Sequence, residues 1–308
     1  MAVSSTNILI IWLSLELNLF SFIPLLINKS KINEIEASIS YFLSQALASI
    51  LFLARIVIML NLHWQTKIIF LLLNLSLLLK LGMAPCHYWF LIVIEKIRWI
   101  NCLIISTWQK IAPLFIIAYI IKPRTFIRTI IACLNVATGS ILGLRQLSLK
   151  KILACSSITH IGWATGRLII KLPCLLTAYF LLYIIIVSPL FLIINKTDKQ
   201  LLNNSWHKLP NSLKLSTIIL LLSLRGLPPL TGFFPKLLII SYLAEYSITA
   251  IAIIVFRSVL SLFFYINIIL NIFIAIQNSL KEKKSKTALN LVNLSLRTSL
   301  LGLILITL

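Results

Sequence analysis

Residues 77–90 read Leu77-Leu78-Leu79-Lys80-Leu81-Gly82-Met83-Ala84-Pro85-Cys86-His87-Tyr88-Trp89-Phe90, an apolar run that carries one lysine and is then interrupted by glycine and proline. An ammonium group near the middle of a bilayer costs at least about 2.5 kcal/mol, so a lysine there implies a function and polar partners. Glycine and proline free backbone groups that lipid cannot satisfy, and such backbone must be packed in protein or line a wet cavity. The stretch therefore predicts a discontinuous membrane helix with a functional lysine beside its break.

Composition places the whole chain in the membrane. It is 60% hydrophobic and 11% charged, whereas soluble domains are about half apolar and a quarter charged. The apolar runs are about 20 residues long, as membrane-spanning helices require, and lack the alternating pattern of a β-barrel. The sequence thus predicts an all-α polytopic helix bundle, a single membrane domain over residues 1–308. We expect ten crossings, at residues 7–27, 36–61, 67–95, 100–121, 125–145, 151–170, 174–194, 213–244, 248–276 and 289–308.

Two of these crossings are too long for one straight helix. We expect the crossing at 67–95 to break around Gly82 to Pro85, and that at 213–244 to break between Gly226 and Gly232. Broken helices at corresponding places in two halves of a chain are typical of transporters built from inverted repeats.

The net charge of +21 could indicate nucleic-acid binding, but here the charges separate apolar segments and do not cluster on a soluble face. Fifteen lysines and arginines fall in the odd-numbered loops and five in the even-numbered loops. Basic residues accumulate in loops that remain on the side of insertion. The count therefore predicts odd loops on that side and both termini on the opposite side.

Cofactor and metal motifs are lacking in the sequence. The cysteines stand singly, so we interpret them as small apolar side chains without disulfides or metal: Cys86, Cys102, Cys133, Cys155 and Cys174. There is no G-x-G-x-x-G, P-loop or cysteine cluster, which gives no support to nucleotide, flavin or iron–sulfur binding. The chain enters its first apolar segment almost at once, and we expect no cleavable presequence.

Four ionisable residues lie at predicted mid-membrane depth: Glu16, Lys80, Lys110 and Lys236. Burial disfavours the charged form of either type of group and an opposite charge favours it, so a small movement of a partner can load or release a proton. The set predicts a proton relay. Alternatively, the lysines snorkel to the interface, which requires positions near helix ends, and the carboxyl of Glu16 stays neutral or meets a polar neighbour.

Three further residues have two open interpretations. His160 could relay protons because its unperturbed pKa lies near neutrality, or it could be a packed neutral histidine. Lys151 begins a crossing and could be a relay residue or a topology charge. His87 lies beside the first break and could line the same cavity or have no functional role. Glu34 and Glu36 lie near the first loop, where we expect a solvated helix start.

Six stretches, which follow one another in order over nearly the whole chain, carry a resemblance to a known family: residues 15–18, 36–49, 80–89, 107–113, 151–163 and 226–236. They resemble the family of NADH dehydrogenase subunit 2 of animal mitochondria. The resemblance implies two inverted five-helix repeats, without several N-terminal helices of the bacterial relatives. It implies proton-relay roles for Glu16, Lys80, Lys110 and Lys236, and we expect Glu16 and Lys80 to form a charge pair.

The resemblance also implies a function and a location. The chain would be an antiporter-like core membrane subunit of respiratory complex I, a proton-translocating NADH:ubiquinone oxidoreductase, in the mitochondrial inner membrane. Its partners would be the other membrane subunits and the lipid bilayer, with no nucleic acid. It would bind no cofactor, since NADH, FMN, iron–sulfur clusters and ubiquinone belong to other subunits. The odd loops would face the matrix and both termini the intermembrane space. A cation/proton antiporter subunit and a purely structural membrane subunit are the alternatives.

The sequence departs from the family in two respects. It begins close to Glu16, without a short N-terminal segment that animal members usually have. It also carries arginines at or near membrane depth where the family usually has small or polar residues: Arg55, Arg167, Arg225 and Arg257. Only three methionines accompany many isoleucines. One hypothesis accounts for the departures: a mitochondrial code that reads AGA and AGG as serine and ATA as methionine, with starts other than ATG.

Overall fold

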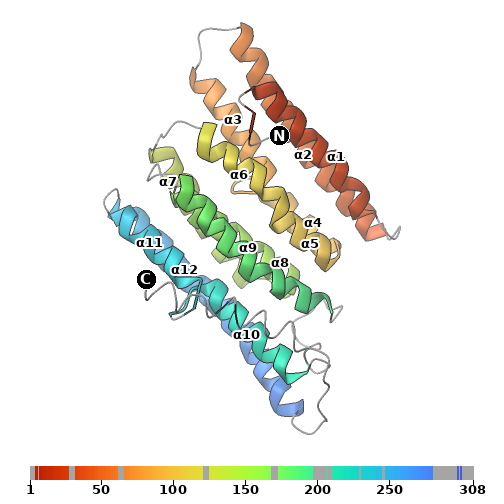
Figure 1. Cartoon of the computed structure of the whole chain (residues 1–308), viewed down its shortest axis with the longest axis vertical. Helices are drawn as coiled ribbons and strands as arrows, with labels where there is room; N and C mark the ends of the chain where they lie inside the picture. Colours follow the sequence, from red (N-terminus) through yellow and green to blue (C-terminus); the bar gives the residue numbers. More distant parts are fainter. Residues whose placement is uncertain are drawn as a thin grey trace. The chain divides into compact units, whose positions relative to one another are not determined.

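The computed structural model describes residues 4–5, 7–27, 32–61, 66–120, 125–167, 173–196, 206, 210–228, 230–244, 247–279, 297 and 299. In this part of the chain α-helices make up the fold, which confirms the predicted all-α membrane bundle (Figure 1). Among the described residues, five segments are long and apolar enough to cross a membrane: Ile8–Leu26, Ile32–Met59, Trp99–Ala118, Leu176–Asn195 and Ile248–Gln277. The crossing predicted at 289–308 lies almost entirely outside the described residues.

The helices form two compact units, residues 1–124 and 125–308. In the first unit, α2 packs against α1, α3 and α4, and α6 packs against α3 and α5. Asn7 accepts a 3.0 Å hydrogen bond from the N–H of Leu9 and so caps the start of α1. The helices are α1 (Ile8–Leu26), α2 (Ile32–Asn61), α3 (Thr66–Leu81), α4 (Tyr88–Lys96), α5 (Trp99–Ser106) and α6 (Trp108–Ile120).

The first predicted break separates α3 from α4. Gly82 adopts φ +64°, a conformation that favours glycine, and a Cβ there would lie 2.8 Å from Cβ of Phe90. The indole Nε1 of Trp89 donates a 3.0 Å hydrogen bond to the carbonyl of Leu79, which also accepts one from the N–H of Gly82. The break is thus packed inside the protein and satisfied by it, as a membrane requires.

The crossing predicted at 100–121 is also interrupted, which the sequence analysis did not anticipate. The interruption is confined to Thr107, between α5 and α6. Its hydroxyl donates a 2.6 Å hydrogen bond to the carbonyl of Leu103. A threonine side chain that bonds its own helix in this way competes with the backbone ladder, and such bonds often bend helices.

In the second unit, α7 packs against α8 and α12, and α10 packs against α9 and α12. At Gly139 of α7 a Cβ would lie 2.6 Å from Cγ2 of Thr159, so the glycine permits the close approach of α8. The helices are α7 (Thr125–Leu144), α8 (Leu149–Arg167), α9 (Pro173–Asn195), α10 (Asn211–Arg225), α11 (Phe233–Ala244) and α12 (Ile248–Ser279).

Three lysines that the charge count had assigned to odd-numbered loops lie inside helices of this unit. Lys150 and Lys151 belong to the first turn of α8 and Lys214 to the first turn of α10, and Lys150 and Lys214 are buried. Their assignment to loops was wrong. The count assigned each basic residue from its position in the chain, which does not show where a helix begins or which way its side chains face.

The second predicted break separates α10 from α11. Gly226 closes α10 with φ +74°, and its N–H donates to the carbonyls of Leu222 and Ser223. Gly232 then returns against the end of α10 so closely that a Cβ there would lie 1.8 Å from the carbonyl oxygen of Ser223. The absence of a side chain at Gly232 therefore allows the two sides of the break to touch.

We predict that Gly232→Ala destabilises the protein by about 3 kcal/mol or more, because the new methyl group must displace backbone. Gly166→Ala is the matched control, since its Cβ would meet nothing nearer than 3.7 Å. The measurement is the yield and thermal stability of the assembled, detergent-solubilised complex that contains each variant. Equal stability of the two variants would contradict the contact between the sides of the break.

Candidate functional site

The first unit brings together two of the predicted relay residues. Lys80, in the last turn of α3, places its Nζ 3.5 Å from Oε1 of Glu16 on α1. The side chains are 3% and 15% exposed, so this ion pair is largely shielded from solvent. The buried Oε1 atom makes no hydrogen bond within the described part of the chain. The two groups are therefore held mainly by their charges, and their attraction depends on the distance between α1 and α3.

Lys110 lies on α6 and is only 2% exposed. Its Nζ is 4.2 Å from the centroid of the Phe90 ring, within the range of a cation–π interaction. Phe90 belongs to α4, directly after the first break. The third predicted relay residue is thus packed against the same break as Lys80.

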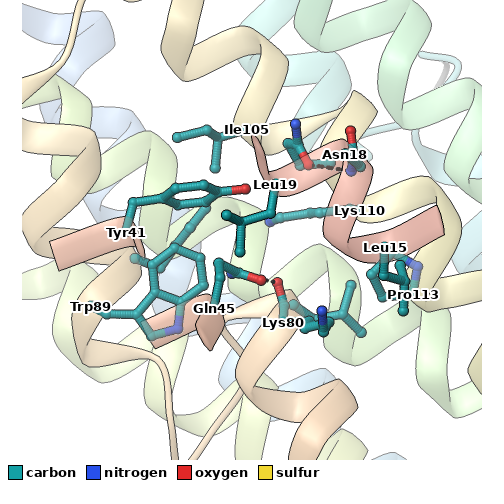
Figure 2. Close-up of a pocket in the computed structure, with 13 residues that line it drawn as sticks. Leu15, Asn18, Leu19, Tyr41, Gln45, Lys80, Trp89, Ile105, Lys110 and Pro113 are labelled. Atoms are coloured by element: carbon teal, nitrogen blue, oxygen red, sulfur yellow. Dashed lines mark hydrogen bonds between the residues drawn. The ribbon is translucent and has the colours of Figure 1, made fainter. Parts of the chain in front are cut away.

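A cavity of about 20 Å³ lies between Lys80 and Lys110 (Figure 2). One water needs about 10–15 Å³ and two or more polar partners, and this cavity supplies both conditions. It can therefore hold a water close to both lysine side chains. The residues that line it are Leu15, Asn18, Leu19, Tyr41, Gln45, Lys80, Leu81, Trp89, Phe90, Ile105, Gln109, Lys110 and Pro113.

Three amide side chains in this cavity were not among the predicted site residues. Nδ2 of Asn18 donates a 2.6 Å hydrogen bond to Oε1 of Gln109, which links α1 to α6. Nε2 of Gln45 donates a 3.4 Å hydrogen bond to the backbone carbonyl of Lys80 (Figure 2). These amides could have been found from the sequence, because each is a polar side chain within an apolar run. Such a side chain needs a hydrogen-bond partner inside the protein. Asn18 and Glu16 share α1, so both contacts depend on the position of one helix.

A second ion pair lies at the end of the first unit where α2 begins. Nε and Nη2 of Arg98 donate to the two carboxylate oxygens of Glu34, at 2.9 and 3.0 Å. These hydrogen bonds raise the pKa of Arg98 above its usual value. Glu34 is buried, so the expected solvated helix start was wrong for this residue, whereas Glu36 stays exposed and pairs with Lys96. Through these two hydrogen bonds, Arg98 joins the connection between α4 and α5 to the start of α2.

In the second unit Lys236 closes the second break. It lies in the first turn of α11, and its Nζ donates to the carbonyls of Leu224 and Arg225, at 3.2 and 2.6 Å. These carbonyls end α10, where the helix dipole favours a positive charge. The ammonium therefore takes up backbone acceptors that the break has freed.

His160 lies beside the same break. Its Nδ1 is 2.9 Å from the hydroxyl oxygen of Tyr179, and its ring centroid is 5.0 Å from that of Tyr183. A cavity of about 10 Å³ is lined by this histidine together with Leu224 and Gly232 of the break. The structure thus places a titratable group against the second break.

Two other candidates lie away from these cavities. Lys151 is half-buried in the first turn of α8. His87 is half-buried with its Nδ1 3.1 Å from the carbonyl of Pro85, and the lining of the first cavity consists of other residues. Among the described residues no three His, Cys, Asp or Glu side chains are placed to hold a metal ion.

The arginines at membrane depth differ in how the protein accommodates them. Arg225 donates to Ser261 and lies against the ring of Tyr265. Arg55 is buried, and its Nε and Nη1 atoms find no hydrogen-bond partner among the described residues. Arg257 is half-buried, and the side chain of Arg167 lies outside the described part of the chain. Arg55 is thus the costly case, because unpaired buried donors lose their hydration without compensation.

A protein-family model described as NADH:quinone oxidoreductase/Mrp antiporter, TM, matches residues 5–261. NADH-ubiquinone oxidoreductase chain 2 of Lumbricus terrestris is 38% identical over 282 residues, which are 88% of this chain and 82% of that protein. This chain belongs to the NADH-ubiquinone oxidoreductase chain 2 family. The family member from Mus musculus is 37% identical over 278 residues, 86% of this chain and 80% of its own length. The resemblance noted from the sequence motifs is confirmed.

Solved structures share the fold of this chain 2 protein. A chain of respiratory complex I from Thermus thermophilus with bound aureothin superposes with a TM-score of 0.82 at 23% identity, over 98% of this chain and 74% of that one. A chain of the Mrp complex from Dietzia sp. DQ12-45-1b gives 0.69 at 20% identity, over 77% of this chain and 51% of that one. The helix bundle is therefore the fold of antiporter-like membrane subunits.

We predict that Asn18 and Gln109 are energetically coupled. Asn18→Leu leaves the half-buried amide of Gln109 unpaired and should cost about 1 kcal/mol, while adding Gln109→Leu should cost little more. A double-mutant cycle on the thermal stability of the assembled complex measures the coupling, which we expect at about 1 kcal/mol or more. Strictly additive effects would show that the hydrogen bond contributes nothing.

We predict serine in place of arginine at position 55 of the purified protein. On α2 the hydroxyls of Ser44 and Ser49 each donate to the carbonyl three residues earlier, and a serine at 55 could do the same without leaving buried donors unpaired. Peptide mass spectrometry after trypsin digestion should show no cleavage after position 55, with cleavage after the ion-paired Arg98 as the control. An arginine mass at 55 would refute the genetic-code hypothesis.

Proposed function

We propose that this chain is a core membrane subunit of the proton-pumping NADH:ubiquinone oxidoreductase of the mitochondrial inner membrane, and that it carries protons. The observation that carries the proposal is the buried Glu16–Lys80 ion pair on a cavity shared with Lys110. Lysines at membrane depth are costly and are retained for proton or ion pathways. Family membership supplies the complex in which such a pathway works.

The proposed cycle in the first unit depends on the distance between Glu16 and Lys80. With the carboxylate near, the ammonium of Lys80 is stabilised, and when α1 moves away the proton leaves for the water in the cavity. Lys110 is the next acceptor, since it borders the same cavity. The hydrogen bond between Asn18 and Gln109 joins α6, which carries Lys110, to α1, which carries Glu16, so Lys110 follows the movement of α1.

The second unit supplies the later steps of the proposed relay. Lys236 exchanges its proton with the far side, and His160 and Lys151 act as intermediate carriers. The carbonyl contacts of Lys236 support its role, and the small cavity beside His160 supports that of His160. The role of Lys151 rests on its place in the stretch 151–163 that resembles the family. Electrons do not enter this chain: NADH, FMN, iron–sulfur clusters and ubiquinone are bound by other subunits, and this chain binds no cofactor or metal.

We also propose an orientation. The odd loops face the matrix and both termini face the intermembrane space, supported by the excess of basic residues in and beside the odd loops. The chain then functions as one membrane domain over residues 1–308, associated with the other membrane subunits of the complex and with lipid.

A cation/proton antiporter is the second candidate, favoured by the fold shared with the Mrp complex. A sodium site would require several oxygen ligands at membrane depth. The carbonyls freed at the second break already accept hydrogen bonds from Lys236, and Glu16 is the carboxylate of the first cavity's ion pair. The geometry therefore favours proton carriage.

The test is Lys80→Met in the assembled complex, with protons ejected per NADH oxidised as the readout. We expect proton ejection to fall about tenfold or more, since a proton carrier is lost. Lys96→Met is the control, because its ion pair with the exposed Glu36 lies at the surface, where such pairs contribute about 0–1 kcal/mol. Unchanged rate and stoichiometry in the Lys80 variant would remove Lys80 from the relay. Poor assembly with normal pumping in the remaining complex would favour a structural role.

A further inference from the structure

Lys214 is a buried lysine that the relay described above does not use. It lies in the first turn of α10 and is 0% exposed. We propose that Lys214 is a proton-carrying residue at the outer end of α10, which exchanges protons between the aqueous phase at that end and the pathway that leads to Lys236. This inference rests on the proposed proton-pumping function.

The contacts of Lys214 place it close to the surface without exposing it. Its Nζ donates a 3.0 Å hydrogen bond to the carbonyl of Ala275 on α12 and a 3.4 Å hydrogen bond to Oδ1 of Asn211. Asn211 begins α10 and is half-buried, so its side chain also reaches solvent. Lys214 is thus one hydrogen bond from the partly exposed Asn211. A water that is bound to the amide oxygen of Asn211 can therefore bring a proton to Lys214.

The electrostatic position of Lys214 favours release of its proton. The N-terminus of a helix carries the positive end of the dipole, where carboxylates are stabilised and ammonium groups are not. A side chain that only had to hold α10 and α12 together would not need to release a proton. Arginine would suit that purpose, since it holds its charge when buried, whereas a lysine can lose its proton.

The opposite end of α10 has the opposite character. There the terminal carbonyls of Leu224 and Arg225 accept hydrogen bonds from Lys236. Eleven residues separate Lys214 from Arg225, about 16 Å along the helix axis. A lysine therefore lies at each end of α10: Lys214 at its N-terminus and Lys236, from α11, at its C-terminus. The C-terminus, which faces the break, is the end that favours an ammonium group.

Buried hydroxyl groups lie along α10 between these ends. Ser216, Thr217 and Ser223 are buried, and the hydroxyl of Thr217 donates 2.7 Å to the carbonyl of Lys214 itself. At about 100° per residue, Thr217 lies near Lys214 around the helix, whereas Ser216 and Ser223 lie on the opposite side. Hydroxyl oxygens retain acceptor capacity after donating one hydrogen bond. In the proposed step Lys214 changes from ammonium to amine as its proton passes to water beside α10, the amine of Lys236 becomes ammonium, and Lys214 is reprotonated from the aqueous side.

The experiment compares Lys214→Arg with Lys214→Met in the assembled complex, with Lys196→Arg and Lys196→Met as controls, since Lys196 is exposed just after α9. Arginine keeps the charge and the donors but does not release its proton. We therefore expect both Lys214 variants to lower proton ejection per NADH about tenfold, with the arginine variant assembled at normal levels and both controls unchanged.

Several results would overturn the proposal. If Lys214→Arg pumps like the natural protein while Lys214→Met assembles poorly, Lys214 is a structural tether. If both variants pump normally, it carries no proton at all. If the methionine variant does not assemble, the arginine variant decides alone. Lys80→Met in the same preparations separates this result from the proposed function: normal pumping there defeats the function, whereas loss of pumping there with normal Lys214→Arg defeats only the role of Lys214.

Discussion

The structure depends on one constraint: hydrocarbon offers no hydrogen bonds, so every group freed at a helix break must be satisfied from inside the protein. The two breaks meet this constraint differently. At the first, neutral donors from Trp89 and Gln45 take up the carbonyls of Leu79 and Lys80. At the second, the ammonium of Lys236 takes up the carbonyls at the end of α10.

This difference decides what each lysine can do. Because neutral side chains already satisfy the first break, Lys80 is available to a carboxylate on a separate helix. Its environment therefore changes whenever α1 and α3 move relative to each other. Lys236 is instead bonded to backbone within its own broken crossing, so movement of other helices alters its contacts less. Lys80 is the responsive group, and Lys236 is a fixed one.

The sequence was sufficient for those features that follow from the cost of burying polar groups in lipid. The helix bundle, both breaks and the meeting of Glu16 with Lys80 could be predicted, because apolar length, Gly–Pro runs and ionisable residues are visible in the chain. The interruption at Thr107 was not predicted, since it depends on which acceptor one hydroxyl takes. The burial of Lys150, Lys214 and Glu34 was missed for a related reason: at a helix end, neighbouring helices decide whether a charged side chain faces inward.

The hydrogen bonds of Lys236 explain how such a fixed group could still change its protonation state. An ammonium has three N–H donors, and two of them are directed to the carbonyls of Leu224 and Arg225. A neutral amine retains two N–H donors, which is enough to keep both of these hydrogen bonds. Its lone pair then takes the third direction, so a proton can leave and return along that direction without disturbing the break. Lys80 has no comparable arrangement with Glu16, because their attraction disappears when either group loses its charge. The contact of Lys80 with Glu16 thus depends on charge, whereas the contacts of Lys236 persist in both protonation states. A relay built from both can respond to movement at the first break while the second break keeps its structure.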